Sequence, residues 1–168
     1  AFQHIFRREK LNAAIIEGDS FHRYDREAMR ATMAERSLTG DNHFSHFGPE
    51  ANLLAELEGL FREYGECGRG KSRHYVHDDA EAKLYGSPPG TFTEWSDLPA
   101  GTDLLFYEGL HGAAQTDAID ISRHVDLCVG VVPIINLEWI QKLHRDKAQR
   151  GYSTEAVMDT ILRRMPDY

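Results

Sequence analysis

Cysteine and positive charge are both scarce in this sequence, and long apolar runs are missing. The 168 residues include two cysteines, Cys67 and Cys128, which are too few for a disulfide scaffold and typical of reduced thiols. Lys and Arg number 19 against 27 Asp and Glu, and the net charge of −8 argues against nucleic acid or an anionic membrane as a partner. No run approaches the roughly 20 apolar residues of a membrane-spanning helix, so we expect a cytoplasmic protein.

The composition is that of a globular domain. Apolar residues make up 41% and charged residues 27% of the chain, which argues against intrinsic disorder. The length suits a single domain. The chain begins at Ala1 inside a helical pattern and stops at Tyr168 directly after another, so we expect an internal piece of a longer protein.

Short apolar strands alternate with amphipathic helices, which predicts an α/β fold with a parallel sheet. The predicted buried strands are residues 13–17, 103–109 and 126–133, the last ending at Pro133. Helices are predicted at the opening, from the cap Asp25 to about residue 37, over residues 51–64, from the cap Asn136 to Gly151, and after the cap Ser153. We expect loops over residues 39–50 and most of 78–95, and a strand over 72–77.

One segment matches the phosphate-loop pattern G-x-x-x-x-G-K-S through Gly65, Gly70, Lys71 and Ser72. A working phosphate loop needs a strand before it and a helix after it, so that backbone N–H groups surround the phosphates. Here a helical pattern precedes the segment and a strand-like pattern follows it. We therefore predict a basic turn between a helix and a strand.

Two predicted strands end in carboxylates. Asp19 follows the first strand, with His22, Arg23 and Arg26 close behind, and Glu108 ends the second. Ligands of open parallel sheets bind beyond the carboxyl ends of the strands, where Asp19 could accept a proton and Glu108 could bind Mg²⁺. A surface or helix-capping role for Asp19 and a loop-facing Glu108 remain open alternatives.

A third cluster lies on the predicted helix near the carboxyl end. Lys142, Arg145 and Asp146 fall within one helical turn and share a face, with Arg150 beyond them. Such a face suits phosphate neutralisation or a closing lid, and a solvated charged face is the alternative.

The histidines do not predict a transition-metal site. His74 and His77 lie three apart, so on a strand they point to opposite faces. His43 and His46 lie in a loop without a carboxylate or cysteine framework around them.

Five segments together resemble the bacterial phosphoribulokinases over essentially the whole chain: IEGDSFHR, DNHFSHFGPEAN, YVHDDAEA, LLFYEGLHG and INLEWIQKLHRDKAQRGYSTEAVMDTILRRM. The resemblance implies a partial kinase domain of the phosphoribulokinase and uridine kinase type over residues 1–168. Its fold would be the P-loop NTPase-like, nucleoside-monophosphate-kinase-like one, a mostly parallel sheet flanked by helices, incomplete here. The family's first strand and its phosphate loop would precede Ala1, and a further region would follow Tyr168.

The resemblance also implies an activity. Members of this family use ATP and Mg²⁺ to phosphorylate the 1-hydroxyl of D-ribulose 5-phosphate, in the Calvin cycle. We expect a homo-oligomer when full length, NADH as an allosteric activator, and an inactive isolated fragment. Cys67 and Cys128 do not match the redox-switch cysteines of the plant relatives.

The family's functional positions map onto individual residues of this sequence. Asp19 matches the catalytic base, and Glu108 and Asp146 match acids of catalysis or metal binding. Lys142 matches an ATP-linked position. Positions of substrate binding fall on His22, Arg26, Tyr75, His77, Arg145 and Arg150, and positions tied to allosteric control fall on Arg8, Arg163 and Arg164.

Three other functions remain open on the sequence alone. A kinase resembling uridine kinase would phosphorylate another small molecule. A non-catalytic module would bind a sugar phosphate without turnover, because the chain lacks a convincing nucleotide loop. A His-rich metal hydrolase would contain stoichiometric zinc.

Overall fold

A computed structural model describes residues 2–132 and 134–163, with backbone alone for residues 149, 150 and 163. The chain divides into two compact units, residues 1–128 and 129–168.

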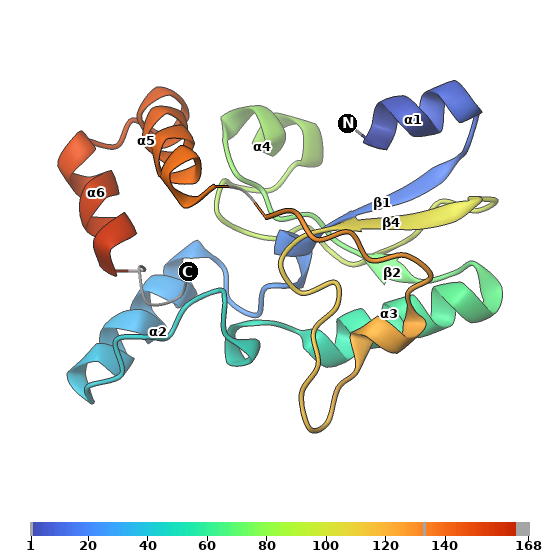
Figure 1. Cartoon of the computed structure of the whole chain (residues 1–168), viewed down its shortest axis with the longest axis horizontal. Coiled ribbons are helices and arrows are strands. Elements are labelled where there is room, and N and C mark those ends of the chain that lie inside the picture. The colour runs from blue at the N-terminus through green and yellow to red at the C-terminus, as the bar shows by residue number, and fades with distance from the viewer. Residues whose placement is uncertain (1, 133, 164–168) are drawn as a thin grey trace. The chain divides into compact units, whose positions relative to one another are not determined.

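The first unit is built on two parallel strands, β1(Ala13–Glu17) and β4(Leu104–Glu108), which run side by side in Figure 1. Ala13 pairs with Leu104 and Glu17 with Glu108. The two predicted strands are thereby confirmed, and both carboxyl ends lie at one edge. Each strand is half-buried rather than fully buried, since Ile15 is 40% exposed and the β4 side chains are intermediate or exposed.

Helices cover both faces of this pair (Figure 1). On one face, α1(Phe2–Glu9) places Phe2 and Phe6 against Phe106 of β4, with ring centroids 5.1 and 5.4 Å apart. Aromatic pairs at such distances pack favourably beyond their buried area. The helix predicted at the opening is thereby confirmed.

On the other face, α3(Leu54–Cys67) contributes the core. Its leucines at helical spacing pack with Ile16 of β1, and Leu57 is fully buried. Alternation along the strands explains the two faces, because Ile16 and Tyr107 are register partners on the α3 side. The remaining elements are short: η1(Gly18–Phe21), η2(Pro49–Ala51), β2(Lys71–Ser72), α4(Asp79–Tyr85), β3(Ser96–Asp97) and η3(Ile121–His124).

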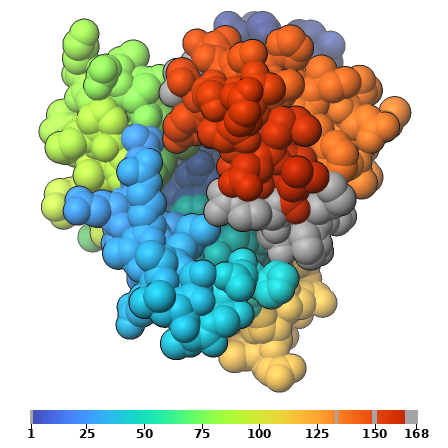
Figure 2. Space-filling model, turned by 90° about the vertical axis from the view of Figure 1, so that its left-hand side faces the viewer, coloured from blue at the N-terminus to red at the C-terminus, as the bar shows by residue number. Residues whose placement is uncertain are grey.

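The second helix, α2(Arg26–Leu38), begins where predicted. Asp25 is its N-cap and accepts a hydrogen bond from the backbone N–H of Ala28 at 2.8 Å. Figure 2 shows α2 and the loop after it, in blue to cyan, as part of the surface. The helix accordingly buries only Met29 fully.

Three predictions of local structure are wrong or only partly right. Residues 126–132 form no strand, because Val131 and Val132 are 83% and 91% exposed and no described segment pairs with them. A strand needs a neighbour for its backbone hydrogen bonds. The strand predicted over residues 72–77 shrinks to β2 and an isolated bridge between Tyr75 and Phe92. The predicted loop 78–95 contains α4.

The second unit is a pair of helices, α5(Ile135–Arg150) and α6(Thr154–Arg163). The first begins one residue before Asn136, so Asn136 is not its cap. Gly151 ends α5 in a left-handed conformation with φ of 67°, and the Ser153 hydroxyl accepts from Ala156 N–H at 3.2 Å, both as predicted. No helix in the described residues is long and apolar enough to cross a membrane.

Candidate active site

The carboxyl ends of β1 and β4 approach each other through two glycines. A Cβ on Gly18 would lie 2.8 Å from Gly109 Cα, and one on Gly109 would lie 2.7 Å from Gly18 Cα. No side chain fits between backbones this close. Of the predicted acids, Asp19 follows β1 and Glu108 is the last residue of β4, so both lie at the edge where open parallel sheets bind their ligands.

Asp19 is a half-exposed carboxylate between two histidines. Its Oδ1 lies 3.1 Å from Nε2 of His22, and its Oδ2 lies 3.7 Å from Nε2 of His77. The hydrogen bond from His22 holds the pKa of Asp19 below its usual value, although partial burial opposes this and the charges of His22, His77 and His46 support it. The side chain is 51% exposed, so a bound hydroxyl group can reach an ionised carboxylate.

His22 is buried and fixed from several sides. Its Nδ1 lies 2.8 Å from Oδ1 of Asn52, which is 2% exposed, and its ring lies 4.0 Å from the ring of His46. Asn52 was not predicted as a site residue, because it falls inside the helix predicted over residues 51–64. Here Leu53 takes the cap position without a side-chain bond, and the Asn52 amide turns toward His22.

Arg73 is a second residue that the sequence did not single out. Its guanidinium donates to the carbonyls of Ser20 at 2.9 Å and His22 at 2.7 Å, and lies 3.6 Å above the ring of Phe92. Two charge-assisted bonds and a cation–π contact fix the backbone on both sides of Phe21. The turn that carries Asp19 is thereby held to a segment about fifty residues away. No local signal for Arg73 exists in the sequence.

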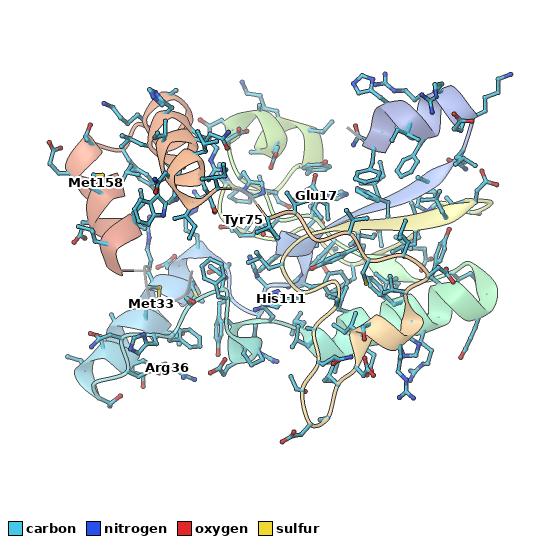
Figure 3. All side chains as sticks on the ribbon, viewed as in Figure 1. Glu17, Met33, Arg36, Tyr75, His111 and Met158 are labelled. Carbon is cyan, nitrogen blue, oxygen red and sulfur yellow. The ribbon has the colours of Figure 1, made fainter. Side chains whose placement is uncertain are left out.

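Tyr75, His77 and Arg26 lie around the same turn. The Tyr75 ring centroid is 5.0 Å from that of His77 and 6.5 Å from that of His22. Arg26 donates from Nη2 to the His77 carbonyl at 2.9 Å. Figure 3 labels Tyr75 and His111, which come from separate segments near the end of β1. The structure thus brings five predicted residues together in one unit, Asp19 and His22 included.

Tyr107 adds a neutral hydroxyl to this edge. Its phenolic oxygen would lie 2.7 Å from a Cβ built on either Gly18 or Gly109, so it lies against both strand ends. Burial raises the pKa of Tyr107 to about 12, with a lowering contribution from the backbone N–H of His111 and raising contributions from Asp19 and Glu108. The group therefore stays protonated at neutral pH and serves as a donor.

In the second unit, the predicted cluster on α5 is an ion-pair network. Lys142 Nζ lies 2.6 Å from Oδ2 of Asp146, and Arg145 Nε lies 3.4 Å from Oδ1. Asp146 is only 2% exposed, whereas the Arg145 side chain is 54% exposed. The prediction that these three share a helix face is confirmed, and Arg145 is the cation with room to reach a ligand.

Four predicted residues remain to be placed. Arg8 lies on α1 and pairs with Glu9 at 2.7 Å, with its side chain 75% exposed. The Arg150 and Arg163 side chains and the whole of Arg164 lie outside the described residues.

The metal question turns on carboxylates rather than histidines. His74 stacks on Tyr85, with ring centroids 4.3 Å apart, whereas His77 faces Asp19. Across residues 2–132 and 134–163 no group of three or more His, Cys, Asp or Glu could hold a metal ion. Glu108 is an exposed carboxylate at the strand edge, which fits Mg²⁺, an ion that takes one or two protein carboxylates and completes its shell with phosphates and water.

The segment matching a phosphate loop has the predicted context. Gly65 lies inside α3, Gly68 ends that helix with φ of 66°, and Lys71 begins β2. A helix C-terminus presents carbonyls, whereas a phosphate needs the N–H groups of a helix N-terminus. The segment is a basic turn between a helix and a strand, as predicted.

Comparison with known families gives a match over the whole chain. The family described as "Phosphoribulokinase / Uridine kinase family" matches residues 1–168. The chain is 68% identical to a phosphoribulokinase of Nitrobacter vulgaris over 167 residues, which covers 99% of this chain and 58% of that protein. It is 64% identical to the chromosomal phosphoribulokinase of Cupriavidus necator, covering 57% of it. The chain thus spans somewhat more than half the length of these relatives.

Solved structures agree. A phosphoribulokinase from Rhodobacter spheroides superposes with a TM-score of 0.82 at 55% identity, over 98% of this chain and 57% of that one. A D-glycerate 3-kinase from Cryptococcus neoformans superposes with a TM-score of 0.61 at 16% identity, a likeness of fold alone. Both likenesses place the chain in the α/β fold of the P-loop kinases, as the sequence predicted.

Proposed function

Because the chain belongs to the phosphoribulokinase and uridine kinase family, we propose that the complete protein transfers a phosphoryl group from ATP to the 1-hydroxyl of D-ribulose 5-phosphate. The products are D-ribulose 1,5-bisphosphate and ADP, a step of the Calvin cycle. Residues 1–168 form part of a single kinase domain. The observation that carries the proposal is the half-exposed Asp19 carboxylate at the end of β1, ordered by His22 and His77.

Asp19 is the base of this reaction. Phosphoryl transfer asks a protein mainly to position the reactants and neutralise charge, with a base near the attacking hydroxyl. The lowered pKa of Asp19 keeps it ionised at neutral pH. Its Oδ1 is engaged by His22, so Oδ2, with only the longer contact to His77, accepts the proton of the hydroxyl.

The cations and aromatic groups around Asp19 bind the sugar phosphate. Arg26, His77 and Tyr75 lie around the turn and supply a guanidinium, an imidazole and a phenol, groups that bond phosphate and sugar oxygens. His22 completes this set. In the second unit, Arg145 is an exposed cation that we assign to substrate binding. Arg150, whose side chain lies outside the described residues, is assigned the same role on the family resemblance alone.

Mg²⁺ and ATP are the cofactors of the proposed reaction. Glu108 would hold Mg²⁺ in the first unit, directly or through water. In the second unit, Asp146 is the other carboxylate assigned to catalysis or metal binding, and Lys142 would contact ATP. The bound ion would supply charge neutralisation on the transferring phosphoryl group. Lys142 approaches Asp146 at 2.6 Å, so removal of Asp146 takes away the carboxylate that pairs with the mostly buried Lys142 ammonium.

Control by NADH and assembly as a homo-oligomer complete the proposal. Arg8 is an exposed cation on α1 and suits an effector or a subunit contact, and Arg163 and Arg164 are the further arginines assigned to this control.

The test is ADP release by the complete gene product with ATP, Mg²⁺ and ribulose 5-phosphate, with and without NADH. Turnover with ribulose 5-phosphate that far exceeds turnover with uridine supports the proposal. Preference for uridine contradicts the substrate. Sugar-phosphate binding without ADP release, under saturating ATP and with NADH, contradicts the activity and leaves a binding protein.

A further inference from the structure

The hydrogen bonds of Asn52 allow one orientation of its side-chain amide. Its Nδ2 lies 2.9 Å from the carbonyl oxygen of His46 and 2.7 Å from that of Gly48. Both oxygens are acceptors, so the amide NH₂ group faces them and donates its two hydrogens. Oδ1 therefore faces His22, whose Nδ1 lies 2.8 Å away. Because Oδ1 can only accept, Nδ1 of His22 carries a proton.

This proton decides the state of the other ring nitrogen. With Nδ1 protonated, a neutral His22 ring has a bare lone pair on Nε2, and Nε2 lies 3.1 Å from Oδ1 of Asp19. A lone pair and a carboxylate at that distance repel each other unless one proton lies between them. His22 and Asp19 therefore hold one proton between them, as an imidazolium that donates from Nε2 to an ionised carboxylate.

Other titratable groups face the pair, among them Tyr107 on β4, whose pKa the charge of Asp19 helps to raise. His46 stacks on the His22 ring at 4.0 Å, and His77 faces Oδ2 of Asp19 at 3.7 Å. The guanidinium of Arg73 bonds the His22 carbonyl at 2.7 Å, and His111 lies 3.4 Å from the Asn52 amide. Tyr75 meets the ring edge-on, with centroids 6.5 Å apart. Among the contacts described above, Asn52 Oδ1 is the acceptor that lies at Nδ1 of His22.

We propose that Asn52 is a positioning residue that holds His22 in the Nδ1-protonated form and so binds one shared proton between His22 and Asp19. The neutral form with the proton on Nε2 would also satisfy Asp19, but it would turn a bare Nδ1 toward the Asn52 oxygen. Asn52 excludes that form. If the shared proton is lost, the hydrogen bond between His22 and Asp19 is therefore lost with it. The consequence for catalysis rests on the proposed kinase function: Asp19 stays oriented with Oδ2 toward the substrate hydroxyl while the shared proton stays in place.

The direct test is ¹⁵N NMR of the histidine rings in the complete gene product, with His22 assigned by its loss in His22→Gln. We expect both His22 nitrogens to carry protons near pH 7. A neutral ring protonated only on Nε2 would overturn the proposal, whatever the kinase activity of the protein.

Two variants at one position isolate the Asn52 oxygen. Asn52→Asp and Asn52→Leu both lose the hydrogens that bond the carbonyls of His46 and Gly48, and only Asn52→Asp keeps an acceptor for Nδ1. We expect Asn52→Asp to keep the doubly protonated ring. In Asn52→Leu nothing holds Nδ1 as the donor, so we expect the ¹⁵N spectrum to show a ring protonated on Nε2 alone, the form that still bonds Asp19.

The control is Asn12→Leu, which removes a bond to the Gly101 carbonyl at the opposite end of β1. It should leave the His22 spectrum unchanged. If kinase activity is present, the pH profile of kcat/KM should change in Asn52→Leu and stay as in wild type in Asn52→Asp. The same His22 protonation pattern in Asn52→Asp and Asn52→Leu would overturn the proposal. An NMR shift without any kinase activity would uphold the role of Asn52 and contradict the proposed function instead.

Discussion

Two glycine-containing segments of the first unit differ in what their sequences indicate: one matches a known motif without its structural context, and the other has such a context without a motif. The segment Gly65–Ser72 has every letter of a phosphate loop, yet a helix runs into it and its Lys71 is an exposed side chain 3.9 Å from Asp97. The turn η1 matches no general motif, yet it follows a parallel strand and carries Asp19. The type of element before a turn decides which backbone groups the turn presents: a helix C-terminus presents carbonyls, whereas the end of a parallel strand lies where ligands bind.

The packing of the two turns differs in the same sense. A side chain at Gly18 would meet Tyr107 and the backbone of Gly109, whereas in the other segment one at Gly70 would meet only the side chains of Leu60 and Leu98, and one at Gly65 nothing within 4 Å. Arg73 and Asn52 additionally fix η1 by hydrogen bonds. A site that positions a reacting group needs such over-determined surroundings, and a surface turn does not.

Asp19→Asn in the complete gene product removes the carboxylate that distinguishes η1 from the basic turn. We expect kcat to fall by about 10²–10⁴-fold with little change in KM, because the amide cannot accept the substrate proton. Steady-state kinetics with ribulose 5-phosphate measure both constants. A change in KM alone would remove Asp19 from the role of base.

Gly18→Ala tests the close approach of the strand ends. The added methyl group would lie 2.7 Å from the Tyr107 hydroxyl and 2.8 Å from Gly109 Cα. Since backbone has to move, we expect a loss of about 1–3 kcal/mol in the free energy of unfolding. Urea denaturation gives the value, and an unchanged midpoint would mean that the two strand ends lie farther apart.

Gly65→Ala is the matched change in the segment that resembles a phosphate loop. Gly65 lies inside α3 with open space around a Cβ, so alanine should stabilise the protein by about 0.5–1 kcal/mol. The same urea titration applies. Destabilisation here would show that residue 65 needs the conformational freedom of a loop glycine, as a true phosphate loop would.

The smallest expected effect concerns acid stability. The pKa of Asp19 is lower in the folded chain than its usual value, so its ionised form stabilises the fold above about pH 4, and this is lost as pH falls through the lowered pKa. The unfolding midpoints of wild type and Asp19→Asn should therefore converge in acid. A gap that widens on acidification would contradict the direction of the shift.

Local patterns in the sequence predicted much of this fold. The strands at residues 13–17 and 104–108, the Asp25 cap and the Gly151 helix end are set by neighbours a few residues away, and all are confirmed. The run 126–132 fails because apolar residues do not say whether a partner strand is present.

The site was predictable to the same extent. Asp19 and Glu108 follow their strands, and this follows from local sequence. Asn52 and Arg73 were not predictable, because their partners lie 30 and more residues away and depend on tertiary packing. Their side chains carry no pattern that distinguishes them from a helix residue and a surface cation.

One assay of ribulose 5-phosphate-dependent ADP formation, applied to two variants, tests directly whether η1 or the segment Gly65–Ser72 carries the catalytic residue. One is Asp19→Asn, and the other is the double change Lys71→Ala with Ser72→Ala, which removes the motif residues of the basic turn. We expect loss of turnover in Asp19→Asn and a rate within about two-fold of wild type in the double variant, since exposed charges of this kind contribute little. Loss of turnover in the double variant with retention in Asp19→Asn would contradict the assignment of the reaction to Asp19.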